Sequence, residues 1–336
     1  MNTKRTFIIA EAGVNHNGDI NLAYKLCDAA KEAGVNAVKF QTWKTENAVS
    51  KSAALAEYQE HNIANKQLSQ FQMLKKLELS YPEFVEIKQY CDKIGIEFMS
   101  SPDTIEDVEF LMKLGVPAQK IGSGDLTNIA FLKRLAQTHQ RVIISTGMSS
   151  LAETEVAYNL LMDNGASEVD ILHCTTNYPC PFDEVNLRAM LTLKEAFKCK
   201  VGYSDHTLGI EVPIAAVAMG AEIIEKHFTL DRTMDGPDHK ASLEPDELKQ
   251  MVICIRNIEK AFGDGIKQPN ASERVIKDVV WKRIVAKTPI KKGQPISYEN
   301  VSFLRSDSGL YAKYWDLVEG KPANKDYSVD EPIVLF

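Results

Sequence analysis

Two histidines stand at the same point of two consecutive strand–helix units in residues 200–230, KVGYSDHTLGIEVPIAAVAMGAEIIEKHFTL. His206 follows the strand-like run VGYSD, and His227 follows EIIEK. Because parallel strands of one sheet end at the same edge, we expect the two imidazoles side by side. Imidazole suits a borderline divalent metal, and a site with few protein ligands leaves room for water and substrate. Such a metal would polarise a carbonyl group. Taken alone, either histidine could instead have a hydrogen-bonded structural role.

Further polar residues also fall at predicted strand ends. Lys39 and Lys120 lie among serine and threonine residues, a mixture that suits a phosphate plus a carboxylate. Glu11 is a candidate acid–base group, because neighbouring lysines can tune a carboxylate for proton transfer. Each lysine could instead be a snorkelling surface side chain, and Glu11 a structural partner for one of them. A shared cavity would explain so much charge on buried strands. The other polar residues at these ends are Asn15, His16, Gln41, Ser100, Ser101, Ser123, Asp125, Ser145, Thr146, Thr175, Thr176, Asn177, Tyr178, Ser204, Asp205 and Lys226.

Eight strand-like runs alternate with amphipathic segments and position these residues. The runs are 7–14, 37–43, 97–102, 118–124, 141–147, 169–178, 200–206 and 222–229. The alternation predicts a parallel α/β sheet, and eight units predict a (β/α)8 TIM barrel with its active site at the C-terminal ends of the strands. A doubly wound open sheet is the alternative, but EAGVNHNGD does not match its Gly-rich phosphate loop. The polar segment 44–80 is expected to be a lid or a wall of the substrate site.

The chain is expected to have three parts. Residues 1–265 form the catalytic barrel, and 266–282 form a linker with Gly, Pro and Asn signals. Residues 283–336 contain short strand-like runs separated by turns such as KKGQPI, which indicates a small β-rich module. This module is short for an independent core, so it should dock onto something larger.

Composition narrows the class of protein. The formal charge of −7 argues against a nucleic-acid partner. The six cysteines form no CxxC pair, which indicates a reduced protein. The N-terminal apolar run is short for a signal peptide, and no apolar stretch would span a bilayer. We therefore expect a cytoplasmic protein without a membrane partner.

A set of motifs occurs in order along nearly the whole chain. It includes FIIAEAGVNHNGD, AVKFQTWK, KIGSGDLTN, VGYSDHTLGIE, EKHFTLD and GPDHKASLEPDEL. Together these motifs resemble the sialic acid (nonulosonate) synthase family, and the C-terminal module resembles the antifreeze-like (SAF) domain of that family. The resemblance implies metal-dependent condensation of phosphoenolpyruvate with an N-acetylated mannose-type sugar, giving a nine-carbon 2-keto acid and phosphate. It also implies a divalent metal, with Mn²⁺ expected first and Mg²⁺ or Co²⁺ as alternatives.

The resemblance also implies a role for each site residue. His206 and His227 match the metal ligands, and Glu11 matches the catalytic carboxylate. Asp125 stands where the family often has glutamate. The family pattern further implies a domain-swapped homodimer, in which Arg305 completes the active site of the partner. The positions that match phosphoenolpyruvate-binding residues are Lys39, Ser101, Lys120, Ser123, Ser145, Thr176 and Ser204. The positions that match sugar-contacting residues are Gln41, Asp125, Tyr178, Asp238 and Arg305.

The sugar and the reaction class have alternatives at this stage. AEAGVNHNGD and VGYSDHTLGIE favour a legionaminic-type enzyme, which takes 2,4-diacetamido-2,4,6-trideoxymannose and makes N,N'-diacetyllegionaminate. N-acetylmannosamine, giving N-acetylneuraminate, is the close second. One rival is an aldolase that forms a Schiff base on Lys39, Lys120 or Lys226. The others are a metal-dependent hydrolase and a non-catalytic carbohydrate-binding protein.

Overall fold

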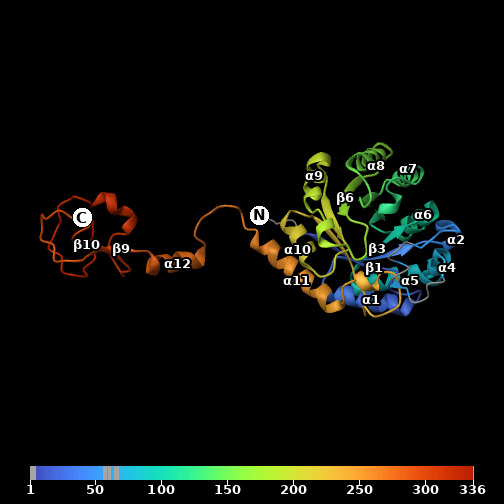
Figure 1. The fold of residues 1–336 in the computed structure, drawn as a ribbon, viewed down its shortest axis with the longest axis horizontal. Helices are drawn as coiled ribbons and strands as arrows, with labels where there is room; N and C mark the ends of the chain where they lie inside the picture. The colour runs from blue at the N-terminus through green and yellow to red at the C-terminus, as the bar shows by residue number, and fades with distance from the viewer. Residues whose placement is uncertain (1–4, 56–58, 60–61, 64–67, 336) are drawn as a thin grey trace. The chain divides into compact units, whose positions relative to one another are not determined.

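The computed structural model describes residues 5–55, 59, 62–63 and 68–335. The chain divides into two compact units, Met1–Gly263 and Asp264–Phe336 (Figure 1). Each unit has its own hydrophobic core. No helix among the described residues is both long and apolar enough to cross a membrane.

The first unit is built around one parallel sheet of eight strands. Their order in the sheet is β3-β2-β1-β8-β7-β6-β5-β4, and the two end strands, β3 and β4, lie next to each other. The sheet is therefore rolled into a nearly closed barrel, which confirms the predicted TIM-barrel fold (Figure 1). The strands are β1 Phe7–Gly13, β2 Ala37–Thr42, β3 Glu97–Pro102, β4 Ala118–Ile121, β5 Arg141–Ser145, β6 Glu168–Cys174, β7 Val201–Asp205 and β8 Ile223–His227.

Helices follow the strands and surround the barrel (Figure 1). Local signals set their ends: α5 begins at a capping box between Ser80 and Glu83 and stops at Gly95, whose φ of +72° favours glycine. The helices are α1 Ile20–Ala33, α2 Thr45–Ala48, α4 Gln70–Leu77, α5 Tyr81–Ile94, α6 Ile105–Leu114, α7 Ile129–Ala136, α8 Leu151–Asp163, α9 Arg188–Phe197, α10 Glu211–Ala218 and α11 Pro245–Ala261. Short 3₁₀ turns are η1 Ser123–Asp125, η2 Phe182–Glu184 and η3 His239–Ala241.

The polar segment 44–80, expected to be a lid or a wall, contains α2 and α4. Its residues 56–58, 60–61 and 64–67 lie outside the described residues. Asn62 Nδ2 donates a hydrogen bond to Pro237 O at 2.7 Å, which ties this segment to the loop after β8.

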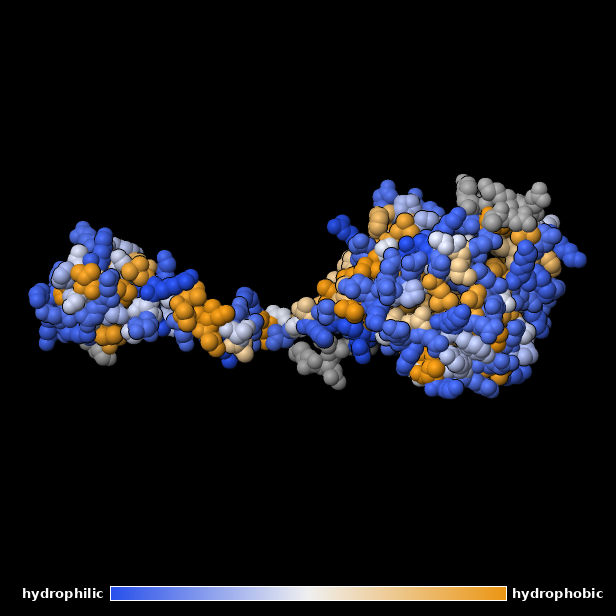
Figure 2. Space-filling model, turned by 90° about the horizontal axis from the view of Figure 1, so that it is seen from below, coloured by the Kyte–Doolittle hydropathy of each residue, from blue (hydrophilic) through white to orange (hydrophobic). Residues whose placement is uncertain are grey.

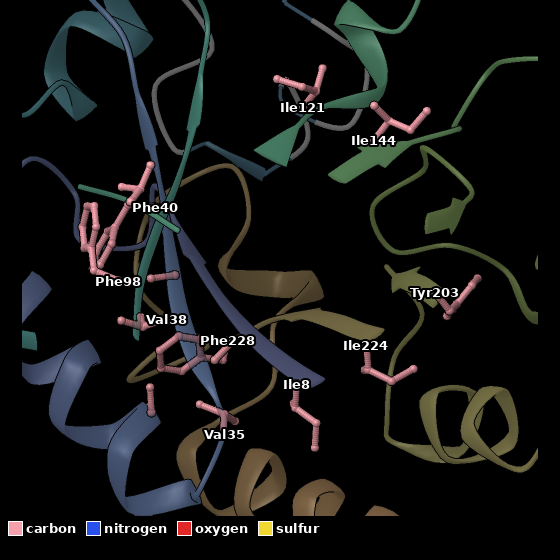
Figure 3. Packing of buried hydrophobic residues seen from close by; sticks show 14 of the residues in the cluster. Ile8, Val35, Val38, Phe40, Phe98, Ile121, Ile144, Tyr203, Ile224 and Phe228 are labelled. Carbon is pink, nitrogen blue, oxygen red and sulfur yellow. The ribbon is translucent and has the colours of Figure 1, made fainter. Parts of the chain in front are cut away.

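Side chains alternate between the two faces of the barrel wall, as the two-residue period of a strand requires. On the outer face, Phe40, Phe98 and Phe228 belong to the core between the strands and the helices (Figure 3). On the inner face, one apolar cluster fills the barrel below the C-terminal ends of the strands. Its fully buried members are Ile9, Ala37, Met99, Ala118, Ile143, Leu172 and Ile223.

The second unit contains α12 Ala271–Val280, the antiparallel pair β9 Arg283–Ala286 and β10 Val301–Leu304, and the 3₁₀ turns of η4 Ala312–Leu317. Its core includes Ile284, Trp315, Tyr327 and Ile333. The segment expected as a linker thus holds a helix. Apolar side chains of α12 lie exposed, with Val275 at 73% and Val279 at 67% (Figure 2).

Candidate active site

The inner face changes from apolar to ionic one step above the apolar cluster. Two residues beyond Ile9, Ala37, Ala118 and Ile223 come Glu11, Lys39, Lys120 and Glu225. The period of two points these four side chains into the barrel, and all four line one pocket of about 270 Å³. The two-residue step above one shared apolar cluster therefore brings two cations and two anions together.

These four charges form one buried cluster. Lys39 Nζ lies 2.6 Å from Glu11 Oε2 and 3.7 Å from Glu225 Oε2. Lys120 Nζ lies 3.5 Å from Glu225 Oε1. Each of the four residues is at most 5% exposed. Pairing offsets the cost of burying such charges, and it leaves two ammonium groups facing the pocket.

The two carboxylates of this cluster differ in their protonation behaviour. Burial, reinforced by Glu225 and partly offset by Lys39, raises the pKa of Glu11 to about 7. Burial also works to raise the pKa of Glu225, but Lys120, Lys39 and the Ser204 hydroxyl overcome it and lower that pKa to about 2. Glu225 is therefore a permanent anion, whereas Glu11 can exchange a proton near neutral pH.

Hydroxyl groups border the two lysines. Ser101 Oγ accepts a hydrogen bond from Lys39 Nζ at 3.1 Å, and Ser204 Oγ donates to Glu225 Oε1 at 2.8 Å. Ser123 Oγ accepts from Gly147 N at 3.0 Å. The buried hydroxyl oxygens of Ser145 and Thr176 have no hydrogen-bond partner within the described part of the chain. Unpaired buried hydroxyls beside two lysines fit a site for a bound anion.

The two histidines lie at the strand ends, two residues beyond Ser204 and Glu225. Their ring centroids are 5.5 Å apart, and the Tyr178 ring lies 4.0 Å from that of His206. His206 Nδ1 donates to a backbone carbonyl at 2.7 Å, which leaves its Nε2 lone pair available. His227 Nδ1 is buried without a hydrogen-bond partner among the described residues, 3.7 Å from Asp238 Oδ2.

These features fit a divalent metal held by few protein atoms. Burial, together with His206 and Lys39, lowers the pKa of His227 well below its usual value, so its imidazole is neutral, as a ligand must be. The described residues contain no group of three or more His, Cys, Asp or Glu side chains arranged to hold a metal. A metal here would thus have two imidazole ligands, and water or substrate would complete its coordination.

Buried hydrogen bonds brace the loop that carries Asp238. Ser242 Oγ donates to Asp238 O at 2.7 Å and accepts from Asn15 Nδ2 at 2.9 Å. His239 follows Asp238 in the chain, and its ring hydrogen-bonds through Nε2 to Asn17 Oδ1 at 3.1 Å. The NHN run after β1 thus fixes the loop after β8, although more than 200 residues separate them in sequence.

The structure brings most of the expected site residues into one pocket. Asp238 stands beside it, next to His227. Arg305 is exposed in the second unit, just after β10. The expected residues that line the pocket are Glu11, Lys39, Gln41, Ser101, Lys120, Ser123, Asp125, Ser145, Thr176, Tyr178, Ser204, His206 and His227.

Lys226 does not belong to this set, and its expected place among the converging residues is wrong. It lies between Glu225 and His227, so its side chain points to the opposite face of the strand. There it is fully buried, and its Nζ lies 2.6 Å from Asp205 Oδ2. This pair belongs to the packing outside the barrel, so the expected place of Asp205 in the site is wrong as well. Ser100 is misplaced for the same reason, since it lies next to the inward Ser101 and its hydroxyl hydrogen-bonds to that of Thr42 at 2.7 Å.

Two charged pocket residues were missed from the sequence, Glu225 and Asp103. Glu225 lies two residues before His227, and Asp103 lies two residues after Ser101. Strict application of the two-residue period to β8 and β3 would have found both.

Comparison with known proteins agrees with this geometry. The NeuB family matches residues 26–267, and the SAF domain matches residues 283–335. The N,N'-diacetyllegionaminic acid synthase of Campylobacter jejuni subsp. jejuni serotype O:2 is 50% identical over 332 residues, covering 98% of this chain and 99% of that protein. A protein of the same name from Legionella pneumophila is 46% identical and covers 90% of this chain and 86% of that protein.

A solved structure is similar as well. It is the N-acetylneuraminic acid synthetase of Leptospira borgpetersenii serovar Hardjo-bovis, with a TM-score of 0.72 and 37% identity. The match covers 83% of this chain and 93% of that one. The chain therefore belongs to the NeuB family and carries a SAF domain, which confirms the expected kinship with the sialic acid synthases.

Proposed function

We propose that this protein condenses phosphoenolpyruvate with 2,4-diacetamido-2,4,6-trideoxymannose to give N,N'-diacetyllegionaminate and phosphate. The observation that carries the proposal is the layered pocket, in which two buried lysines lie directly beneath two adjacent histidines. The lower layer suits a small dianion, and the upper layer suits a carbonyl compound. The similarity to the legionaminic acid synthases supports the same pair of substrates.

Phosphoenolpyruvate would occupy the lower layer. Lys39 and Lys120 supply the positive charge, and Ser101, Ser123 and Ser145 supply hydroxyl groups around it. Gly147 packs against these hydroxyl groups, because a Cβ at that position would lie 2.0 Å from Thr176 Oγ1 and 2.7 Å from Ser123 Oγ. Fixed hydrogen-bond donors of the protein would thus replace solvent around the phosphate and the carboxylate of the substrate.

His206 and His227 would hold the divalent cation, and we propose Mn²⁺. When bound, the cation supplies Lewis-acid polarisation of the sugar aldehyde. Because His206 and His227 lie above the lysine layer, an aldehyde held beside them would lie next to carbon 3 of phosphoenolpyruvate.

The reaction then proceeds between the two layers. Carbon 3 of phosphoenolpyruvate attacks the aldehyde carbon, and a new C–C bond forms. Water adds to the positive charge that develops at carbon 2. One of its protons passes through ionised Glu11 to the former aldehyde oxygen, and the other goes to the departing phosphate as the keto group forms at carbon 2. Phosphate leaves with cleavage of the C–O bond, and the lysines stabilise its negative charge. Gln41 holds Glu11 in place by donating to its Oε1 at 3.0 Å.

The upper layer would bind the sugar. Tyr178 packs against His206, and Asp238 lies next to His227, so both lie where a metal-bound aldehyde would be held. N-acetylmannosamine is the second candidate, because the similar Leptospira structure is an N-acetylneuraminic acid synthetase. Competition between the two sugars at equal concentration, with mass analysis of the products, separates them. A predominance of N-acetylneuraminate would overturn the choice of sugar.

A Schiff-base aldolase is disfavoured by the same contacts. Lys39 lies against Glu11, and Lys226 is paired with Asp205 outside the pocket, so neither amine is free. Lys120 is the remaining candidate, since burial lowers its pKa, but its Nζ lies 3.5 Å from Glu225 Oε1. Borohydride treatment in the presence of the keto-acid product would trap such an enzyme and should leave this one active.

We further propose that the active form is a homodimer in which Arg305 of one chain completes the site of the other. The exposed apolar face of α12 supports a contact with another surface. Arg305 lies exposed beside Asp307 and Ser306, where a sugar amide could approach it. We place the protein in the cytoplasm, where its six free cysteines would remain reduced.

A further inference from the structure

Two carboxylates line the pocket across the barrel from the histidines. Asp103 follows β3, and Asp125 lies in η1 after β4, whereas His206 and His227 end β7 and β8. In the sheet order, β3 stands four places from β7, and β4 stands four places from β8. In an eight-stranded barrel, strands four places apart face each other across the axis.

Asp103 also lies at the level of the histidines. Strand β3 pairs with β2 so that Ser101 faces Gln41, and the Asp103 N–H then donates to Thr42 O at 3.2 Å. Met99, Ser101 and Asp103 follow one another at steps of two, from the apolar cluster through the lysine layer to the upper layer. The Asp103 side chain thus continues the inner face of β3 into the mouth of the pocket.

The charge of this opposite wall is negative. Lys39 and Lys120 are the only lysines or arginines among the described residues that line the pocket, and both lie in the lower layer. Asp103 is exposed at the mouth of the pocket, but the surrounding barrel wall removes enough water, together with Asp125 and Asp107, to raise its pKa to about 7, as expected for an acid without a cation nearby. Asp125 Oδ1 is already oriented by Asn128 Nδ2 at 3.1 Å. Arg305 of a second chain, brought here as proposed, would be a single cation facing several carboxylates.

We propose that Asp103, together with Asp125, recognises the end of the sugar that lies farthest from its aldehyde. This assignment rests on the proposed function. If the aldehyde lies at the histidines, carbons 4 to 6 of the sugar reach the opposite wall of the pocket. Ionised carboxylates only accept hydrogen bonds, so above a pH of about 7, where Asp103 is ionised, this wall selects amide N–H or O–H groups. The 4-acetamido N–H of the proposed sugar is such a donor. A phosphate at carbon 6 would instead meet like charge, so the wall excludes phosphorylated sugars.

The test compares Asp103→Asn and Asp103→Ala with the wild-type protein and with Asp163→Asn, an exposed carboxylate at the end of α8. Rates are measured with the diacetamido sugar, N-acetylmannosamine and N-acetylmannosamine 6-phosphate. Loss of a charged acceptor should raise the KM for the diacetamido sugar by about tenfold or more in both variants. The KM for phosphoenolpyruvate should stay within about twofold, because Asp103 lies outside the lysine layer. Preference for N-acetylmannosamine over its 6-phosphate should fall in both variants and not in Asp163→Asn.

Two results would overturn the assignment. Variants whose sugar KM and discrimination against the 6-phosphate equal those of the wild type would remove Asp103 from sugar recognition. Equal increases in the KM values of both substrates would indicate a structural role instead. A wild-type protein that releases no phosphate with any of the sugars would overturn the proposed function and this assignment together, whereas an active wild type with unchanged variants overturns the assignment alone.

Discussion

Lys39 Nζ lies 2.6 Å from Glu11 Oε2 inside the barrel, where both residues are almost completely buried. Burial works to lower the pKa of Lys39, but Glu11 and Glu225 overcome it and raise that pKa above its usual value. Lys39 therefore remains a cation, while the pKa of Glu11 rises to about 7. One contact thus holds a permanent charge for an anionic substrate beside a group that can move a proton.

Replacing Glu11 by glutamine should change the pH dependence of stability. The folded protein retains the Glu11 proton up to a pKa of about 7, whereas the unfolded chain loses it near 4.5. The free energy of unfolding should consequently fall as pH rises through this window, and Glu11→Gln should remove that part of the slope. Urea unfolding of both proteins in metal-free buffer measures it. If the free energy of unfolding changes with pH in the same way in both proteins, Glu11 has an ordinary pKa. The variant should also lose at least about a hundredfold in kcat.

His206→Ala and His227→Ala should each nearly abolish turnover and weaken Mn²⁺ binding. The physical reason is that two imidazoles supply the protein ligands, so the loss of either leaves one. Calorimetric titration with Mn²⁺ gives a readout that does not depend on activity, and circular dichroism checks the fold. His139→Asn is the control, since that histidine is exposed and its ring hydrogen-bonds to the backbone carbonyl of Gly165, outside the pocket. Near-normal metal affinity in either alanine variant would refute the metal site.

Lys120→Ala should raise the KM for phosphoenolpyruvate by about tenfold or more while changing the KM for the sugar little. Lys120 lies in the lower layer, next to Glu225 and below the histidines. Initial rates over a grid of both substrate concentrations separate the two constants. An effect confined to the sugar would remove Lys120 from the phosphoenolpyruvate site.

Mixing an Arg305→Ala chain with a His227→Ala chain should restore part of the activity. In a domain-swapped heterodimer both lesions fall on one active site, and the other site is intact. The measurement is phosphate release after subunit exchange, with exchange followed by differently tagged chains. Demonstrated exchange without recovered activity would mean that Arg305 acts within its own chain or has no catalytic role.

The fold and most of the pocket could be predicted from the sequence because strand–helix alternation and the polar strand ends are local signals. Lys226 was misplaced, and Glu225 was missed, because both depend on which face of β8 a residue occupies. The hydrogen bond between Asn15 and Ser242 joins two loops that are distant in sequence, so no local sequence pattern predicts it. The contrast between Glu11 and Glu225 likewise depends on the distances of each carboxylate to the two lysines, which only the folded barrel sets.

The most direct test of the account is phosphate release from phosphoenolpyruvate, measured with and without Mn²⁺ and with each acetamido-mannose in turn. The account predicts phosphate release only when phosphoenolpyruvate, metal and sugar are all present, in equal amounts with a nine-carbon keto acid identified by mass. It also predicts the highest kcat/KM with 2,4-diacetamido-2,4,6-trideoxymannose. Phosphate release that needs no sugar, or keto-acid formation that persists after complete removal of metal, would contradict it.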